Sequence, residues 1–270
     1  MIEANQECRN IADWLTPYSY GLQHRDIFTR HGEGTGKWLL DSPEFKNWLK
    51  TNNLTLFCPG MPGAGKTVIT SMVIEHLWTE FQNDPSIGVA FLYCNYKSLQ
   101  NQKPTDLLAT LLKQLVQEQS FPPESVRSLY MHCNKKRVRP SFQEISQALH
   151  AVVAGYSRTF ILIDALDECQ VPDGGREKVL SVILDLQAKT GVNLFATSRH
   201  IPAIQETFKG SILLEVRASD EDVRKYVEVY ISQLPIFVSR SPGLQEEIKT
   251  EIVNSVDGMC VDPYTLNKTC

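Results

Sequence analysis

The sequence predicts an α/β fold in which a mainly parallel five-stranded sheet carries helices on both faces and is followed by a partial helical subdomain. Apolar or β-branched runs lie at 54–58, 87–94, 159–163, 192–197 and 212–216, and segments with helical spacing of apolar residues separate them. The run 160–163 is apolar throughout, which is typical of a central strand covered on both faces. Strands that alternate with helices usually build a parallel sheet.

Residues 1–52 precede the first predicted strand and read as a lead-in segment with short helical pieces. Phe45 and Leu49 lie four residues apart within 42–49, so they share one face of a predicted helix. The glycines within 32–36 resemble a dinucleotide-binding fingerprint only superficially, because no strand precedes them. We interpret them as a flexible turn.

A glycine-rich loop follows the first strand and precedes a helix whose apolar residues at 69, 72, 73 and 77 share one face. Glycines let the backbone curl around an anion, and the helix that follows adds its positive dipole end. Lys66 is expected to reach the terminal phosphates of a nucleotide, and the Thr67 hydroxyl to hold Mg²⁺. The predicted nucleotide-binding positions are Gly60, Met61, Pro62, Gly63, Ala64, Gly65, Lys66, Thr67 and Val68.

Carboxylates follow the apolar run 160–163. Asp164 ends this strand, and the carboxyl ends of strands are where open α/β sheets present ligands, so Asp164 is predicted to contact Mg²⁺ through water. Asp167 and Glu168 stand just beyond it, and a carboxylate there could orient or deprotonate a water that attacks the γ-phosphate. The alternative interpretation of Asp167 and Glu168 is a solvated acidic turn.

The run 192–197 delivers an arginine to the same predicted edge of the sheet. Arg199 at this position could detect a γ-phosphate through charge-assisted hydrogen bonds, so we assign it a catalytic sensor role. The alternative is a surface arginine that pairs with a neighbouring carboxylate.

Two further helices have clear sequence signals. The apolar stripe within 107–116 begins after Pro104, and Ser141 with Glu144 forms a predicted capping box for the next helix. Both are expected to pack in the core. After the last strand, the sequence predicts one helix at 219–234 and a second that is outlined by Leu244, Ile248, Ile252 and Val256.

Together these segments resemble the NACHT branch of the STAND signal-transduction NTPases, and most of all the fungal NOD-like type that shares the nephrocystin N-terminal NTPase module. The likeness extends over about residues 11–258. It rests on the segments 60–67, 160–169 and 194–199, and on further markers at 25–28, 34–40 and 139–141.

The resemblance implies a switch that binds ATP or ADP with Mg²⁺, in which ADP keeps the protein closed, ATP permits oligomerisation and hydrolysis is slow. It also implies that the lead-in packs beside the nucleotide, with His24 to Phe28 near the adenine. One departure is Ala165, where many relatives carry glycine, and its small size leads us to expect little change. Another departure is the ending, because relatives continue into further helices after Met259 whereas this chain stops at Cys270. We interpret it as a truncated product or a naturally short form.

The predicted domains are a lead-in at 1–52, a P-loop nucleotide-binding domain at 53–217, a partial helical subdomain at 218–258 and an atypical tail at 259–270. At about 150 residues per domain, the length permits one or two domains.

Composition limits the classes of partner that we expect and indicates the cellular compartment. Lysine and arginine total 27 against 31 acidic residues, giving a net charge of −4, so neither nucleic acid nor an anionic membrane is expected as a partner. The seven cysteines are odd in number and lack paired metal-ligand spacing, which favours reduced thiols. No apolar run approaches the roughly 18 residues of a membrane span, and the start lacks a signal region. We predict a cytoplasmic protein.

The leading hypothesis is a nucleotide-binding switch whose output is self-association or association with full-length relatives. ATP is preferred to GTP on resemblance, since the sequence has no Asn-Lys-x-Asp motif. One alternative is a turnover NTPase or phosphotransferase that uses the same loop. Another is an inert truncated fragment that binds full-length relatives.

Overall fold

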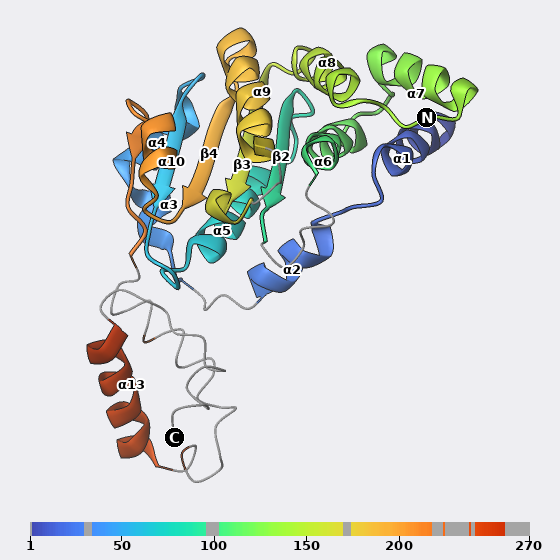
Figure 1. Ribbon diagram of the computed structural model, residues 1–270. Coiled ribbons are helices and arrows are strands. Elements are labelled where there is room, and N and C mark those ends of the chain that lie inside the picture. The colour runs from blue at the N-terminus through green and yellow to red at the C-terminus, as the bar shows by residue number, and fades with distance from the viewer. Residues whose placement is uncertain are drawn as a thin grey trace.

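The computed structural model describes residues 2–29, 34–95, 103–169, 174–217 and 241–256, together with Arg224 and Val238. Its centre is a five-stranded sheet with the order β2-β3-β4-β1-β5, and every pairing is parallel (Figure 1). The predicted α/β class and parallel sheet are confirmed. The strands are β1 (Thr55–Pro59), β2 (Ile87–Tyr93), β3 (Arg158–Asp164), β4 (Asn193–Ser198) and β5 (Ile212–Leu213).

Strand β5 is shorter than the predicted run 212–216. Beyond Leu213 the chain still follows β1, with backbone hydrogen bonds from Leu214 N to Phe57 O at 3.0 Å and from Val216 N to Pro59 O at 2.7 Å. The regular ladder between β5 and β1 covers the pairs Leu56↔Ile212 and Phe57↔Leu213, whereas β2, the other edge strand, pairs with β3 over its full length. An isolated bridge between Gly60 and Val216 completes the contact.

The strand order places β4 between β1 and β3. In the register, Pro59 lies opposite Ser198 and Ile163 lies opposite Ala196. The carboxyl ends of β1, β3 and β4 therefore meet at one edge of the sheet, where ligands bind in open α/β folds.

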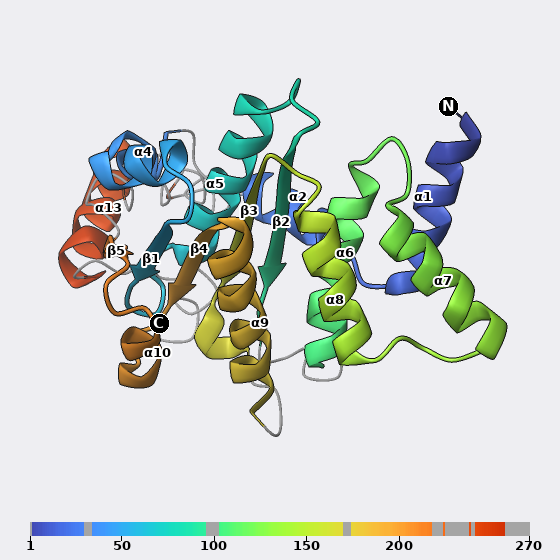
Figure 2. The same ribbon diagram turned by 90° about the horizontal axis from the view of Figure 1, so that it is seen from above.

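Helices cover both faces of the sheet (Figure 2). Side chains of β3 alternate, so that Ile161 and Ile163 join one core while Phe160 and Leu162 join the other. The first core lies under α1 (Ile2–Leu15), α6 (Pro104–Gln117), α8 (Phe142–Val153), α9 (Gly175–Thr190) and α10 (Pro202–Thr207). The second lies under α3 (Lys37–Asp41), α4 (Pro43–Lys50) and α5 (Lys66–Glu80). Helix α2 (Gly21–Thr29) packs on α5, and α7 (Glu124–Lys136) packs on α1 and α8.

Local signals account for where several helices begin. Helix α8 carries the predicted capping box, in which Glu144 N donates to Ser141 Oγ at 3.3 Å and Ser141 N donates to Glu144 Oε2 at 2.8 Å. Helix α6 begins with Pro104 at its first turn, and its apolar stripe is buried as predicted. In α4, Phe45 and Trp48 are buried, and Leu49 is partly buried against the same core. The Trp48 indole also donates to Leu194 O at 2.9 Å.

Helices from the predicted lead-in contribute to both cores. Ile11 and Leu15 of α1 pack in the first core, and Phe45 and Trp48 of α4 pack in the second. Lys113 of α6 holds the end of α1, since its Nζ donates to Asp13 Oδ1 at 3.0 Å and to Thr16 O at 2.9 Å. The described helices of the lead-in thus pack on α5, α6 and β1 and belong to the same body as the sheet.

Near the carboxyl end, α13 (Pro242–Val256) corresponds to the second predicted helix after the sheet. The helix predicted at 219–234 lies outside the described residues apart from Arg224. None of the helices in the described ranges combines the length and apolar character that a bilayer crossing requires.

Candidate functional site

The loop between β1 and α5 requires glycine for two separate reasons. Gly63 and Gly65 have φ angles of 76° and 87°, a left-handed region that residues with a Cβ rarely adopt. Gly60 needs the space, because a Cβ there would lie 2.5 Å from Val216 O. The loop therefore turns tightly against Val216, beyond the end of β5, and leads directly into the amino end of α5.

Lys66, the first residue of α5, folds back over this loop. Its Nζ donates to Gly60 O at 2.9 Å and to Met61 O at 2.7 Å. Burial lowers the pKa of the Lys66 ammonium group, although the nearby carboxylates of Asp167 and Asp164 oppose that shift. Both hydrogen-bond partners are neutral carbonyls, so the positive charge can still attract an anion at the loop.

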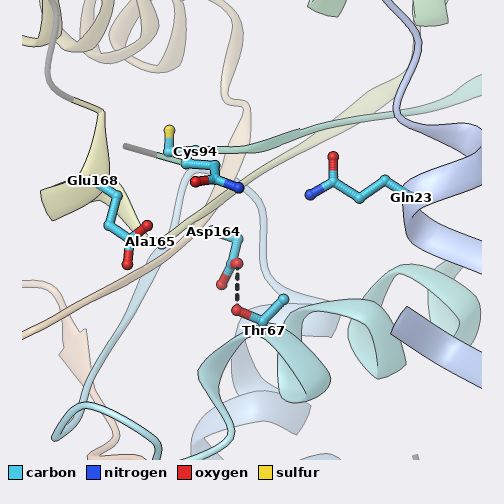
Figure 3. A pocket seen from close by; sticks show the side chains of 7 residues that line it. Gln23, Thr67, Cys94, Asp164, Ala165 and Glu168 are labelled. Atoms are coloured by element: carbon cyan, nitrogen blue, oxygen red, sulfur yellow. Dashed lines mark hydrogen bonds between the residues drawn. The ribbon is translucent and has the colours of Figure 1, made fainter. Parts of the chain in front are cut away.

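Asp164 at the end of β3 lies against α5. Thr67 Oγ1 donates to Asp164 Oδ2 at 2.8 Å, so the structure brings the loop and this carboxylate together (Figure 3). Two further hydroxyls approach the other oxygen, with Thr70 Oγ1 at 3.0 Å and Thr197 Oγ1 at 2.8 Å from Oδ1. Burial raises the pKa of Asp164, and these hydroxyl groups and the charge of Lys66 oppose that rise.

Asp167 and Arg199 form a pair with each other. Arg199 N donates to Asp167 Oδ1 at 2.9 Å, and Arg199 Nε donates to Oδ2 of the same carboxylate. The Asp167 side chain is 2% exposed and that of Arg199 is 46% exposed. Burial of Asp167 opposes its ionisation, but the hydrogen bonds and charge of Arg199 lower its pKa overall. Asp167 therefore lies in no solvated turn, and Arg199 adopts the paired arrangement that was the alternative interpretation.

A cavity of about 250 Å³ opens beside Asp164 at this edge of the sheet. Glu168 lines it from the short 3-10 helix η2 (Leu166–Glu168), while Gln23 reaches it from α2 on the opposite side (Figure 3). Its lining residues are Gln23, Thr67, Cys94, Asn95, Asp164, Ala165 and Glu168.

The sequence analysis did not identify several residues that line this cavity or contact Asp164. Cys94 and Asn95 directly follow β2, so their place at the carboxyl edge could have been inferred once β2 was located. Thr70 lies three residues after Thr67, a spacing that puts both on one helical face. Thr197 could be identified only by knowing that β4 is the neighbour of β3.

Ala165 adopts a left-handed backbone conformation with φ 51° and ψ 51°. The expectation of little change at this position rested on the size of alanine, whereas the structure shows that backbone conformation is the relevant property. A glycine would adopt this conformation without the steric cost that a Cβ imposes.

His24 was expected near the adenine, and that expectation stays a prediction. Its Nδ1 lies 2.9 Å from the Tyr93 hydroxyl, and its Nε2 lies 2.9 Å from Glu75 Oε1. His24 lines a second cavity of about 440 Å³ between α2 and α5, together with Phe28 and Trp78 among others. It is not among the residues that line the cavity at Asp164.

The donor set at Asp164 suits Mg²⁺. This ion prefers oxygen ligands and is usually held by one or two protein groups plus water and phosphate. A threonine hydroxyl and a carboxylate match that preference, and within the described ranges no cluster of three or more His, Cys, Asp or Glu side chains offers another metal site. The described cysteines, at 8, 58, 94, 133 and 169, are free thiols.

Comparisons with known proteins agree with this geometry. The sequence model described as "Nephrocystin 3, N-terminal" matches residues 34–199, which is more than half of the chain. The vegetative incompatibility protein HET-E-1 of Podospora anserina is 27% identical over 214 residues, which cover 73% of this chain but 15% of that protein.

Among solved structures, the Walker-type ATPase paby2304 of Pyrococcus abyssi is similar with a TM-score of 0.50 and 11% identity, covering 87% of this chain and 68% of that one. That likeness supports the fold alone. The segment 34–199, which the nephrocystin 3 sequence model matches, includes the loop, Asp164 and Arg199. The chain therefore belongs to the nephrocystin 3 N-terminal family and is a P-loop NTPase module of the NACHT type.

Proposed function

We propose that this module binds ATP or ADP together with Mg²⁺ and acts as a nucleotide-controlled switch. The observation that carries the proposal is the contact between Thr67 and Asp164, which are 97 residues apart in sequence and meet at the mouth of the glycine-rich loop. A helix amino end, a loop cation and a metal-binding carboxylate converge there, and a nucleoside triphosphate with its metal requires these groups.

Lys66 is assigned to the phosphates. Its ammonium group already donates to Gly60 O and Met61 O within the loop, so phosphate oxygens would replace these neutral acceptors with charged ones. The backbone N–H groups at the amino end of α5 add further donors.

Thr67 and Asp164 are assigned to the metal. When bound, Mg²⁺ supplies charge neutralisation at the β- and γ-phosphates. The Thr67 oxygen would offer its lone pairs to the ion while its O–H group continues to donate a hydrogen bond to Asp164 Oδ2.

Hydrolysis is assigned to Glu168, with Arg199 as the sensor. Glu168 lines the cavity and can orient a water, whereas the Asp167 carboxylate already accepts two hydrogen bonds from Arg199. We therefore assign Asp167 the role of positioning Arg199. An arginine side chain has five N–H donors, so Arg199 can hold Asp167 through Nε and offer its terminal nitrogens to a γ-phosphate. With one of the two candidate carboxylates engaged in this way, slow turnover is expected.

The domain limits form part of the same proposal. Residues 53–217 would form the nucleotide-binding domain and 218–258 the beginning of a helical subdomain that closes over it. We place the module in the cytoplasm, with a second copy or longer relatives as its partners.

The decisive test is substitution of the loop lysine. Lys66→Ala is expected to abolish ATP and ADP binding measured by calorimetry, because the phosphates lose their main cation. Lys189→Ala is the matched control, since Lys189 is exposed on α9 and pairs with Asp185. Unchanged ATP affinity in Lys66→Ala would reject the assignment, and parallel titrations with GTP would establish which base is preferred.

Turnover and association separate the switch from its alternatives. A steady-state rate near or above the roughly 1 per second that is typical of kinases would favour a turnover enzyme. Slow turnover, with a change of size in solution between ADP and a non-hydrolysable ATP analogue, supports the switch. Identical sizes and no nucleotide uptake would indicate an inert fragment.

A further inference from the structure

The two oxygens of the Asp164 carboxylate have different surroundings. Oδ2 accepts from Thr67, which lines the cavity. Oδ1 lies 3.0 Å from Thr70 Oγ1 and 2.8 Å from Thr197 Oγ1, and both of these threonines are fully buried. One oxygen therefore faces the cavity while the other is held by the protein interior.

Thr197 is fixed from two directions. Its hydroxyl oxygen accepts from Ala165 N at 2.9 Å while its proton is donated to Asp164 Oδ1 at 2.8 Å. A hydroxyl that accepts from a backbone N–H in this way has a restricted direction for its own proton. Strand β4 thus fixes both the carboxylate and the turn that follows it.

Thr70 approaches the same oxygen from α5. Its hydroxyl lies 3.0 Å from both Lys66 O and Asp164 Oδ1, and a single proton serves one of these acceptors at a time. Because hydrogen bonds to ionised acceptors are the stronger ones, an ionised Asp164 attracts this proton away from the helix carbonyl. The Thr70 hydroxyl thus comes from helix α5, which covers one face of the sheet, and the Thr197 hydroxyl comes from β4, the strand next to β3.

We infer that Thr70 and Thr197 are positioning residues, which hold Asp164 Oδ1 so that Oδ2 points into the cavity beside Thr67 and is preorganised for Mg²⁺. This inference rests on the proposed function. Partners that orient a metal ligand typically contribute a factor of about 10 to 100 in metal affinity.

The test measures Mg²⁺ dependence rather than activity. Thr70→Val and Thr197→Val remove the hydroxyl with little change in shape, and Thr70→Ser and Thr197→Ser retain it. Thr110→Val is the matched control, because Thr110 is also buried but its hydroxyl donates to Asp106 O in α6. Calorimetry gives the Mg²⁺ concentration at which ATP binding tightens half-maximally, and the ATP affinity in EDTA.

Each valine variant is expected to raise the required Mg²⁺ concentration by about tenfold, and the double variant by more. The ATP affinity in EDTA should stay at the wild-type value, because neither hydroxyl is assigned to the phosphates. Both serine variants and Thr110→Val should show wild-type Mg²⁺ dependence. Thermal unfolding in EDTA checks that each variant is folded, and Thr197→Cys, a weaker donor of similar size, should give an intermediate shift if Thr197→Val is not folded.

Wild-type Mg²⁺ dependence in the folded valine variants would overturn the inference. So would an equal loss of affinity with and without Mg²⁺, since that result indicates general support of the fold. Failure of the proposed function is distinguishable, because then the wild-type chain would not bind ATP or Lys66→Ala would bind it normally.

Discussion

Asp164 and Asp167 are three residues apart at the same end of β3, and both are buried, at 2% and 4% exposure. Their partners differ in charge. Asp164 accepts hydrogen bonds from the neutral hydroxyls of Thr67, Thr70 and Thr197, while Asp167 accepts two from Arg199, one of them from its guanidinium group.

This difference decides what each carboxylate can still bind. The pKa of Asp164 is raised because burial outweighs its neutral donors, whereas that of Asp167 is lowered because the arginine outweighs burial. An ionised carboxylate that accepts its hydrogen bonds from hydroxyls has no directly bonded counter-charge, so it suits a metal cation. One paired with arginine already has a directly bonded counter-charge, so it suits the proposed task of orienting that arginine.

The largest expected effect is a change in the Mg²⁺ concentration that ATP binding requires. Asp164→Asn should raise the Mg²⁺ concentration needed for ATP binding by about 100-fold or more, beyond what the loss of an orienting partner produces, because the charged ligand itself is removed. Calorimetric titrations with Mg²⁺ measure this shift. Asp185→Asn, on the surface of α9, should behave as wild type. An unaltered Mg²⁺ requirement in Asp164→Asn would remove the proposed distinction between the two carboxylates.

Asp167→Asn should act on stability instead. It replaces a charged acceptor of two hydrogen bonds, and we expect a loss of about 2 kcal/mol in unfolding free energy, less than for a fully buried ion pair because Arg199 is half-exposed. Urea denaturation checks the loss. The Mg²⁺ requirement should remain that of the wild type, and a large increase in it would show that Asp167 also serves the metal.

The two aspartates should also shift stability with pH in opposite directions. The pKa of Asp164 is raised in the folded state above its unfolded-state value of about 4. The wild type should therefore lose stability relative to Asp164→Asn as the pH rises from about 4 through the folded-state pKa. Because that of Asp167 is lowered, the advantage of the wild type over Asp167→Asn is present above about pH 4 and is lost as pH falls through the folded pKa. Denaturation in EDTA across this range measures both trends, and trends of the same sign would contradict the comparison.

The smallest effect is expected at Ala165, which directly follows Asp164. Ala165→Gly relieves a left-handed backbone conformation and should stabilise the fold by up to about 1 kcal/mol, leaving the Mg²⁺ requirement unchanged. Arg137→Gly is the control, since Arg137 has a similar φ of 54° after α7 and lies outside the cavity. A destabilised Ala165→Gly beside a stabilised Arg137→Gly would show that the alanine methyl group supports this turn.

Local sequence patterns were sufficient for much of the fold. The strand positions, the loop with its helix, and the capping box at Ser141 all depend on residues close in sequence, and the structure agrees with them. The meeting of Thr67 with Asp164 was predicted by the rule that ligands lie at the carboxyl ends of parallel strands.

Contacts between neighbouring strands could not be predicted in the same way. The roles of Thr197 and Arg199 depend on β4 lying next to β3, and no local pattern encodes strand order. The conformation of Ala165 is imposed by the turn around it rather than by its own preference. For β5, the sequence contains enough β-branched and apolar residues for a longer strand, but the regular pairing ends at Leu213 and no local pattern marks that end.

Strand β4 and the residue that directly follows it carry the contacts of both aspartates, on residues separated by a single position. Thr197 touches Asp164, and Arg199 touches Asp167. Since alternate residues of a strand move together in any change of alignment, a slip of β4 by one residue would misplace both side chains at once. Deleting or inserting one amino acid at the start of this strand should therefore remove the Thr197–Asp164 contact and the Arg199–Asp167 contact together.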